Sequence, residues 1–201
     1  MLTRNSSSKI VLVAALGNPG NKYLKTRHNI GFMFADRVSD FYNFSPFQYC
    51  KKMKGFISVG NICSVPVIIL KPDTFMNRSG IAVSAAVSAF GIKNENLIVV
   101  HDDVDIKFTS HRIKTKGGSG GHNGLRSIEG ELGTDQFVRI RLGIGKPVSN
   151  MDLADFVLAD FLDDELNLIN NSISSKWGEI LLKMISDGVE ESMNTYNRRN
   201  G

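Results

Sequence analysis

His28 is the residue of this sequence best suited to act as a general base. It lies in the triplet Arg27-His28-Asn29, and an unperturbed imidazole has a pKa of about 6.5, which permits proton transfer at neutral pH. A carboxylate that accepts from one ring nitrogen leaves the other nitrogen free to take a proton. The run His101–Asp105 (HDDVD) supplies candidate carboxylates. We therefore expect a His–Asp pair; the alternatives are a capping or solvated histidine and a charged turn.

The same acidic run could also bind a metal ion. It has no second histidine at the spacing of the HExxH zinc motif, and a calcium loop that begins at Asp103 fails because Lys107 and Phe108 occupy positions that need a ligand and a glycine. Magnesium held by one or two of the carboxylates stays open as an alternative.

A glycine-rich segment, Lys116–Gly124 (KGGSGGHNG), allows the backbone to approach a ligand closely. Its GGSGG stretch matches the nucleophile elbow G-x-S-x-G around Ser119, but an acid and then a histidine must follow the serine, and no histidine follows His122. The dinucleotide pattern fails at Asn123, and a phosphate-binding P-loop fails around Gly145-Lys146. The alternative for this segment is a flexible surface loop.

Three asparagines in expected loops complete the set: Asn18, Asn77 and Asn123. If held rigidly, their amides could fix a substrate carbonyl or donate to an oxyanion. Each alone is more often a turn or cap residue, and Asn77 is placed to cap a helix. A His–Asp pair with amide donors, and without an evident nucleophile, fits hydrolysis of an acyl or phosphate ester by water.

The charge distribution indicates a polyanionic partner. The chain has 201 residues and a net charge of +4, but residues 1–150 carry 20 basic and 10 acidic side chains, whereas residues 151–201 carry 4 and 10. A basic body of this kind favours binding to a polyanion, with chance scatter as the alternative. Two cysteines are too few for a disulfide framework or a four-cysteine zinc site. Residues 79–92, uncharged, are too short and serine-rich to cross a membrane.

Alternating strand and helix patterns predict the fold class. We expect strands at 10–16, 55–60, 65–70, 97–101, 110–115 and 137–144. Helices are expected at 29–43 and 77–90, then a long amphipathic helix through Leu166, Ile169, Ile173, Trp177, Ile180, Leu181 and Met184, then 188–198. The prediction is one α/β domain over residues 10–201, a three-layer arrangement of a mixed, mostly parallel sheet flanked by helices, after a flexible extension of residues 1–9. In such sheets, sites gather beyond the carboxyl ends of the strands, where residues 17–20, 71–77 and 101–105 fall.

Four runs of the sequence resemble the bacterial-type peptidyl-tRNA hydrolases. They are LGNPGNKYLKTRHNIGF (16–32), KPDTFMNRSG (71–80), VVHDDVDI (99–106) and GGSGGHNGLRSI (117–128), and FVRIRLGIGKP (137–147) and DFVL (155–158) continue the match in order. The resemblance implies a monomeric α/β enzyme. It implies cleavage of the ester between a peptide and the 3′ ribose of tRNA, on peptidyl-tRNA released from stalled ribosomes. A cytoplasmic location is expected by default, because no membrane or export segment is predicted, and ester hydrolysis by water needs no metal or other cofactor if the base, its orienting acid and the oxyanion donors are preorganised.

The resemblance also implies roles for individual residues. His28 would activate water and Asp102 would orient it, while Asn18, Asn77 and Asn123 would hold the substrate and stabilise the oxyanion. The substrate cleft would be formed by Tyr23, Phe75, Met76 and, in a mobile gating loop, His122. Lys114 and Arg141 match the family's clamp on a tRNA phosphate, with Arg112 and Arg139 beside them. The six acidic residues of 152–165 would then lie away from the RNA.

The sequence departs from the family pattern in two loops. Ser119 stands where histidine is frequent, Lys116 stands where glycine is common, and residues 107–110 lack the usual Leu-Pro-Pro-Gly style of turn. Two other functions remain to be distinguished. One is an RNA-binding relative without catalysis, which the complete catalytic set disfavours, and the other is an esterase that uses Ser119.

Overall fold

The computed structural model describes residues 9–147 and 151–197. Its strands are β1 (Val11–Ala15), β2 (Gln48–Cys50), β3 (Gly55–Ile62), β4 (Val65–Pro72), β5 (Leu97–Asp103), β6 (His111–Lys114) and β7 (Val138–Gly143). The α-helices are α1 (Ile30–Phe41), α2 (Ser79–Phe90), α3 (Asn123–Leu132), α4 (Leu153–Leu158), α5 (Asp163–Leu168), α6 (Ser174–Ser186) and α7 (Val189–Tyr196). Short 3₁₀ turns include η1 (Asn21–Tyr23), η2 (Arg27–Asn29), η3 (Met76–Arg78) and η4 (Asn94–Asn96), and η5 (Ile169–Ile173) is a π turn.

The strands form one mixed sheet in the order β2-β3-β4-β1-β5-β7-β6. Its four central strands, β4, β1, β5 and β7, are parallel, whereas β2, β3 and β6 add antiparallel pairs at the two edges. The α/β prediction is confirmed, with the parallel part confined to the centre. All carboxyl ends of the parallel strands therefore lie at one edge, where the predicted loops meet.

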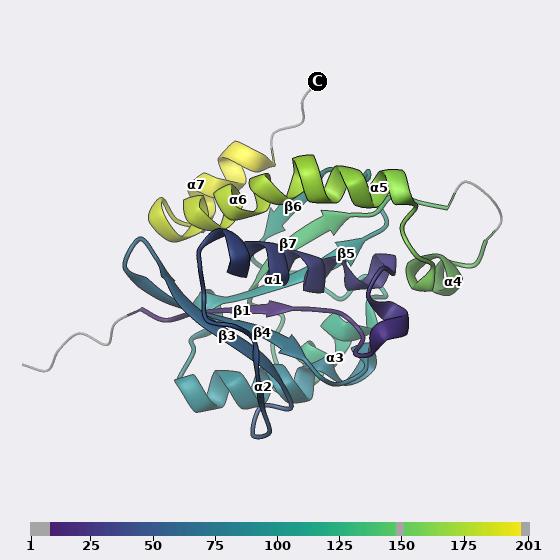
Figure 1. Cartoon of the computed structure of the whole chain (residues 1–201). Helices are drawn as coiled ribbons and strands as arrows, with labels where there is room; N and C mark the ends of the chain where they lie inside the picture. Colours follow the sequence, from purple (N-terminus) through teal and green to yellow (C-terminus); the bar gives the residue numbers. More distant parts are fainter. Residues whose placement is uncertain (1–8, 148–150, 198–201) are drawn as a thin grey trace, which may run out of the picture.

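Helices cover both faces of the sheet (Figure 1). One core lies beneath α1 and α6, where Phe34 packs on Trp177 with ring centroids 5.5 Å apart. The other lies beneath α2 and α3 and includes Val83 and Ile128. β1 is buried along its whole length because helices cover it on both sides, which explains its unbroken apolar sequence.

Helix α1 lies very close to the sheet at Gly31. A Cβ atom at this position would clash with the backbone carbonyl oxygens of Leu16 and Val100, so only glycine permits this approach. The close packing places η2, the turn just before α1, against the carboxyl ends of β1 and β5. It thereby sets the position of His28.

Some expectations differ from the structure. The predicted cap at Asn77 is wrong, because α2 begins at Ser79 and Asn77 lies within η3. The long C-terminal helix is interrupted by the π turn between α5 and α6, and neither β2 nor α3 was expected. Residues 1–8 of the predicted extension lie outside the described residues. Within the described part of the chain, we find no helix whose length and apolar character would let it span a bilayer.

Candidate active site

A cleft of about 660 Å³ opens at the carboxyl edge of the sheet. Most of the predicted site residues line it: Asn18, His28, Phe75, Met76, Asn77, Asp102, Lys114, His122, Asn123, Arg139 and Arg141. Tyr23 lies edge-on to Phe75, with ring centroids 6.4 Å apart, and Arg112 pairs with Arg141 across the β6–β7 register. The fold therefore gathers residues that are up to 123 positions apart in the sequence at one site.

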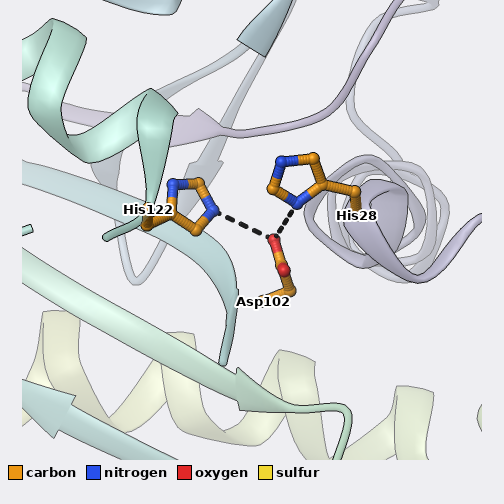
Figure 2. Close-up of side chains that lie close together, drawn as sticks. All are labelled: His28, Asp102 and His122. Carbon is orange, nitrogen blue, oxygen red and sulfur yellow. Dashed lines mark hydrogen bonds and ion pairs between the residues drawn. The ribbon is translucent and has the colours of Figure 1, made fainter. Parts of the chain in front are cut away.

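His28 and Asp102 form a hydrogen bond at the base of this cleft (Figure 2). The Nδ1 atom of His28 lies 2.8 Å from Oδ1 of Asp102, and both residues are buried. A carboxylate accepts hydrogen bonds, so the Nδ1 atom carries the proton and the Nε2 atom carries the lone pair. This tautomer is the one that a general base needs.

His122 donates to the same carboxylate oxygen from the other side (Figure 2). Its Nε2 atom lies 3.0 Å from Oδ1 of Asp102, while its Nδ1 atom accepts from the backbone N–H groups of Gly124 and Leu125 at the start of α3. The helix start therefore fixes the His122 tautomer. A Cβ atom at Gly124 would come within 3.0 Å of the side chains of Met76 and Leu16, so a larger residue here would displace them.

The electrostatics of the pair favour a charged Asp102. Burial alone would raise the pKa of this carboxyl, but His28 and His122 lower it far below its ordinary value. For His28, burial opposes protonation, yet the attraction of the Asp102 carboxylate and its hydrogen bond raise the pKa above the ordinary 6.5. A base with a raised pKa is a stronger proton acceptor.

The spacing of His28, Asp102 and His122 could suit a metal ion, because their ligand atoms lie within 4.8 Å of one another. The tautomers argue against it. A metal at Nε2 of His122 would move the ring proton to Nδ1, which already faces two N–H donors. The other candidates of the acidic run are occupied, Asp103 by Arg141 at 2.6 Å and Asp105 by Lys146 at 2.8 Å. The arrangement is therefore better suited to proton transfer than to metal binding.

Asn18 is held by a second asparagine that we did not predict. Asn29 accepts from the N–H of Asn18 at 2.8 Å and donates to its carbonyl at 3.0 Å. The side-chain oxygen of Asn18 accepts from the N–H of Met76 at 2.8 Å, which leaves its amide NH₂ as the group available to a ligand. Asn29 follows His28 directly, and this adjacency is the only signal in the sequence that could have identified it.

Asn77 and Asn123 are exposed at the cleft surface. The Oδ1 atom of Asn123 accepts from Arg126 at 3.1 Å, so its NH₂ group stays available. Neither side chain forms a hydrogen bond with His28 among the described residues. Both are therefore placed to meet a ligand rather than to position the base.

The four basic residues of the predicted clamp share one face of the sheet, because Arg112 pairs with Arg141 and Lys114 with Arg139. Lys114 is exposed and forms no ion pair among the described residues. Arg141 uses its Nε for Asp103. Arg139 differs: its buried guanidinium donates to the carbonyl of Gly118 at 2.9 Å and to Glu129, so it anchors the glycine-rich loop.

The glycine-rich loop offers no serine nucleophile. Both ring nitrogens of His122 are engaged, so this histidine cannot activate Ser119. Among the described contacts, none joins the Ser119 hydroxyl to a histidine. Gly117, Gly120 and Gly121 have φ values of 133°, 58° and 86°, which explains the glycine content as a backbone requirement.

His101 is a buried histidine that the mechanism does not require to titrate. Its Nδ1–H donates to the carbonyl of Asp102 at 2.7 Å, and its ring packs edge-on against His122. Burial, followed by the proximity of His122, lowers the pKa of His101 to about 3. It therefore stays neutral and fixes the backbone that carries Asp102.

Comparison with known proteins shows which family the chain resembles over most of its length. The family model for peptidyl-tRNA hydrolase matches residues 12–201. A peptidyl-tRNA hydrolase of Ehrlichia canis is 50% identical over 164 residues, 82% of this chain and 82% of that protein, and one of Pseudothermotoga lettingae is 42% identical over 92% of this chain and 96% of that protein. The crystal structure of the Acinetobacter baumannii peptidyl-tRNA hydrolase superposes with a TM-score of 0.86 at 35% identity, covering 96% of this chain and 97% of that chain.

The buried His101 predicts a dependence of stability on pH. Below pH 6.5 the unfolded chain is protonated at this histidine, whereas the folded chain is not, so stability falls as the pH drops towards 3. Between pH 6 and 4, the free energy of unfolding of H101N should therefore fall by about 1.4 kcal/mol less per pH unit than that of the wild type. The raised pKa of His28 acts in the opposite direction, but equally in both proteins. Urea unfolding across this range measures the difference, and parallel curves would contradict it.

Proposed function

This chain belongs to the peptidyl-tRNA hydrolase family and hydrolyses peptidyl-tRNA, and we propose that it does so with a water molecule activated by His28. The observation that carries this proposal is the hydrogen bond from His28 to Asp102 within the cleft. The bond leaves the Nε2 atom of His28 unprotonated and therefore able to take a proton.

The proposed reaction is the addition of water to the ester carbonyl. Nε2 of His28 removes a proton from water as the water oxygen bonds to the carbonyl carbon, which gives a tetrahedral oxyanion. The intermediate then collapses, the bond between this carbon and the 3′ oxygen of the ribose breaks, and His28 returns the proton to that oxygen. The products are a peptide with a free carboxyl group and a tRNA with a free 3′ hydroxyl. The Asp102 carboxylate stabilises the imidazolium between these two transfers.

The asparagines supply neutral hydrogen-bond donors for this reaction. Asn18 is rigidly held by Asn29 and Met76, and its NH₂ group would hold the substrate carbonyl or main chain. Asn77 and Asn123 would position the substrate and the water and stabilise the oxyanion. Donors that are fixed before the reaction stabilise developing charge without having to reorganise.

The surroundings of these residues suit the two halves of the substrate. Tyr23, Phe75 and Met76 would contact the peptide and the terminal adenosine, with His122 and its loop closing over them. Lys114 and Arg141 would bind a tRNA phosphate, with Arg112 beside them. Because Arg139 is already occupied by Gly118 and Glu129, we expect its part in tRNA binding to be indirect. Phosphate contacts of this kind give affinity without reading sequence, as an enzyme for every tRNA requires.

Further properties complete the proposal. We expect a monomer in the cytoplasm that needs no metal ion or other cofactor, and activity that survives treatment with EDTA would support this. The acidic residues of 152–165 include Asp155 and Asp160, which are exposed, so the RNA backbone should lie on the other side of the cleft.

Two other functions make different predictions. An RNA-binding relative without catalysis would bind tRNA but release no N-acyl amino acid. An esterase with Ser119 as its nucleophile would be labelled by a fluorophosphonate probe. Because both ring nitrogens of His122 are hydrogen-bonded, we expect neither a serine mechanism nor labelling by the probe.

One prediction from the proposed mechanism concerns the base. H28A should reduce hydrolysis of N-acetyl-aminoacyl-tRNA by at least about 100-fold, because general base catalysis contributes roughly 10²–10⁴. Binding of uncharged tRNA should persist, since His28 lies in the cleft and not on the basic face. Single-turnover hydrolysis and filter binding measure the two quantities. Normal turnover by H28A would refute the assignment of the base.

A further prediction concerns the phosphate clamp. K114A should raise KM for the tRNA substrate. It should also lower the slope of log KM against log salt concentration by about one, because one phosphate contact is lost. Lys114 is the cleaner choice, since R141A would also leave Asp103 without its partner. K93A is the matched control, because Lys93 is exposed at the opposite edge of the sheet, before β5. Equal KM values for K114A and the wild type at several salt concentrations would refute the clamp.

A further inference from the structure

A second buried charge lies next to the proposed base in the sequence. Arg27 is only 7% exposed, although an arginine is seldom buried unless its charge is paired. Its guanidinium donates to Glu165 at 2.7 Å and to the carbonyl of Asp160. It also stacks over the rings of Phe156 and Phe161, with its central carbon 4.7 and 5.2 Å from their centroids. All four partners belong to the segment that contains α4 and the start of α5.

The backbone reinforces this connection. The N–H of Arg27 donates to the carbonyl of Ala159 at 3.0 Å, the N–H of Phe161 donates to the carbonyl of Lys25 at 2.9 Å, and Thr26 forms an antiparallel bridge with Asp160. Residues 25–27 and 159–161 are therefore joined by main chain as well as side chain. Because η2 also carries His28, these contacts hold the 159–161 segment against the turn that carries the base.

The segment held by Arg27 forms part of the cleft. The α4 wall, which we define as Leu153, Ala154, Val157 and Leu158, lines the cleft together with His28. None of the residues of α4 is fully buried, and Phe156 and Val157 are only partly buried against the core. The position of α4 therefore also depends on contacts such as that of Phe156 with Arg27.

An apolar pair could join these segments with less desolvation than a buried ion pair. The planar guanidinium, however, fixes direction: it meets a carboxylate, a carbonyl and two aromatic rings at once. Glu165 is fixed in turn, since it also accepts from the N–H of Leu162 at 2.8 Å. The chemistry of Arg27 is therefore suited to setting a geometry and not merely to adding stability.

We propose that Arg27, paired with Glu165, is a positioning residue that sets the α4 wall against His28, and that this wall receives the side chain of the esterified amino acid. The wall is apolar and lies within the acidic stretch 152–165, so it suits an apolar side chain better than a phosphate. The tRNA phosphates have the basic residues Lys114 and Arg141 instead. This inference rests on His28 as the base of the proposed mechanism.

Arg27 acts on binding and not on the base. The pKa of His28 is determined by burial and by Asp102, and Glu165 compensates the charge of Arg27 locally. Loss of the guanidinium should therefore displace the wall, weaken substrate binding and leave the acid limb of the pH–rate profile in place.

The experiment compares R27M and R27K with the wild type on N-acetyl-phenylalanyl-tRNA and N-acetyl-glycyl-tRNA. R27M should raise KM for the phenylalanyl substrate roughly tenfold, the size expected when an apolar pocket contact is lost, and should raise it much less for the glycyl substrate. The kcat value should stay within about threefold of the wild type. R27K should resemble R27M, because an ammonium group cannot reproduce the fork and the stacking. E165Q should shift KM in the same direction.

R37M is the matched control. Arg37 also joins α1 to the C-terminal helices, through Asn170 at 2.6 Å, but at an exposed position outside the cleft. All variants are assayed well below their melting temperatures, so that lower stability alone does not change KM. An equal rise of KM for both substrates, an unchanged KM, or a shifted acid limb would each overturn the proposal. If H28A is active, the base assignment fails; if H28A is inactive and R27M behaves as the wild type, only the present inference fails.

Discussion

One oxygen atom, Oδ1 of Asp102, is the point on which the site depends. It accepts from two imidazole N–H groups, at 2.8 Å from His28 and 3.0 Å from His122. A buried carboxylate is costly unless it is hydrogen-bonded, and these two donors keep it ionised. The ionised carboxylate in turn holds His28 in the tautomer that accepts a proton. The same two hydrogen bonds therefore stabilise the buried charge of Asp102 and prepare His28 for catalysis.

The fold serves this atom from three directions. β5 carries Asp102, the close packing of α1 at Gly31 places His28 in the preceding turn η2, and His122 lies at the start of α3. His122 is itself fixed by the N–H groups at the start of α3. His101 is kept neutral beneath the site, where its N–H secures the backbone of Asp102. The glycine-rich loop that lines the cleft is consequently linked to His28 through a single carboxylate.

Much of this arrangement could be predicted from the sequence, because local patterns carry it. The unbroken apolar runs of β1 and β5 indicated central parallel strands, and their carboxyl ends located the site. The chemistry of His28 indicated a partner carboxylate in the run His101–Asp105, and the family resemblance singled out Asp102, which the structure brings to His28. What could not be predicted depends on contacts between distant segments. The tautomer of His122 depends on the N–H groups at the start of α3. In the sequence, Arg139 alternates with apolar residues just as Arg141 does, and only its contacts with Gly118 and Glu129 show that its guanidinium is buried. The carbonyls and rings around Arg27 lie more than 120 residues away in the sequence.

The most direct test of the central claim is the pH dependence of kcat/KM for wild type and D102N, with N-acetyl-aminoacyl-tRNA as substrate. The acid limb reports protonation of the base in the free enzyme. Since the pKa of His28 is raised, wild-type activity should fall as the pH drops through a midpoint above 6.5. D102N should move this midpoint to lower pH and reduce the plateau by at least about 100-fold. A wild-type midpoint at or below 6.5, or a D102N profile that coincides with that of the wild type, would contradict the account.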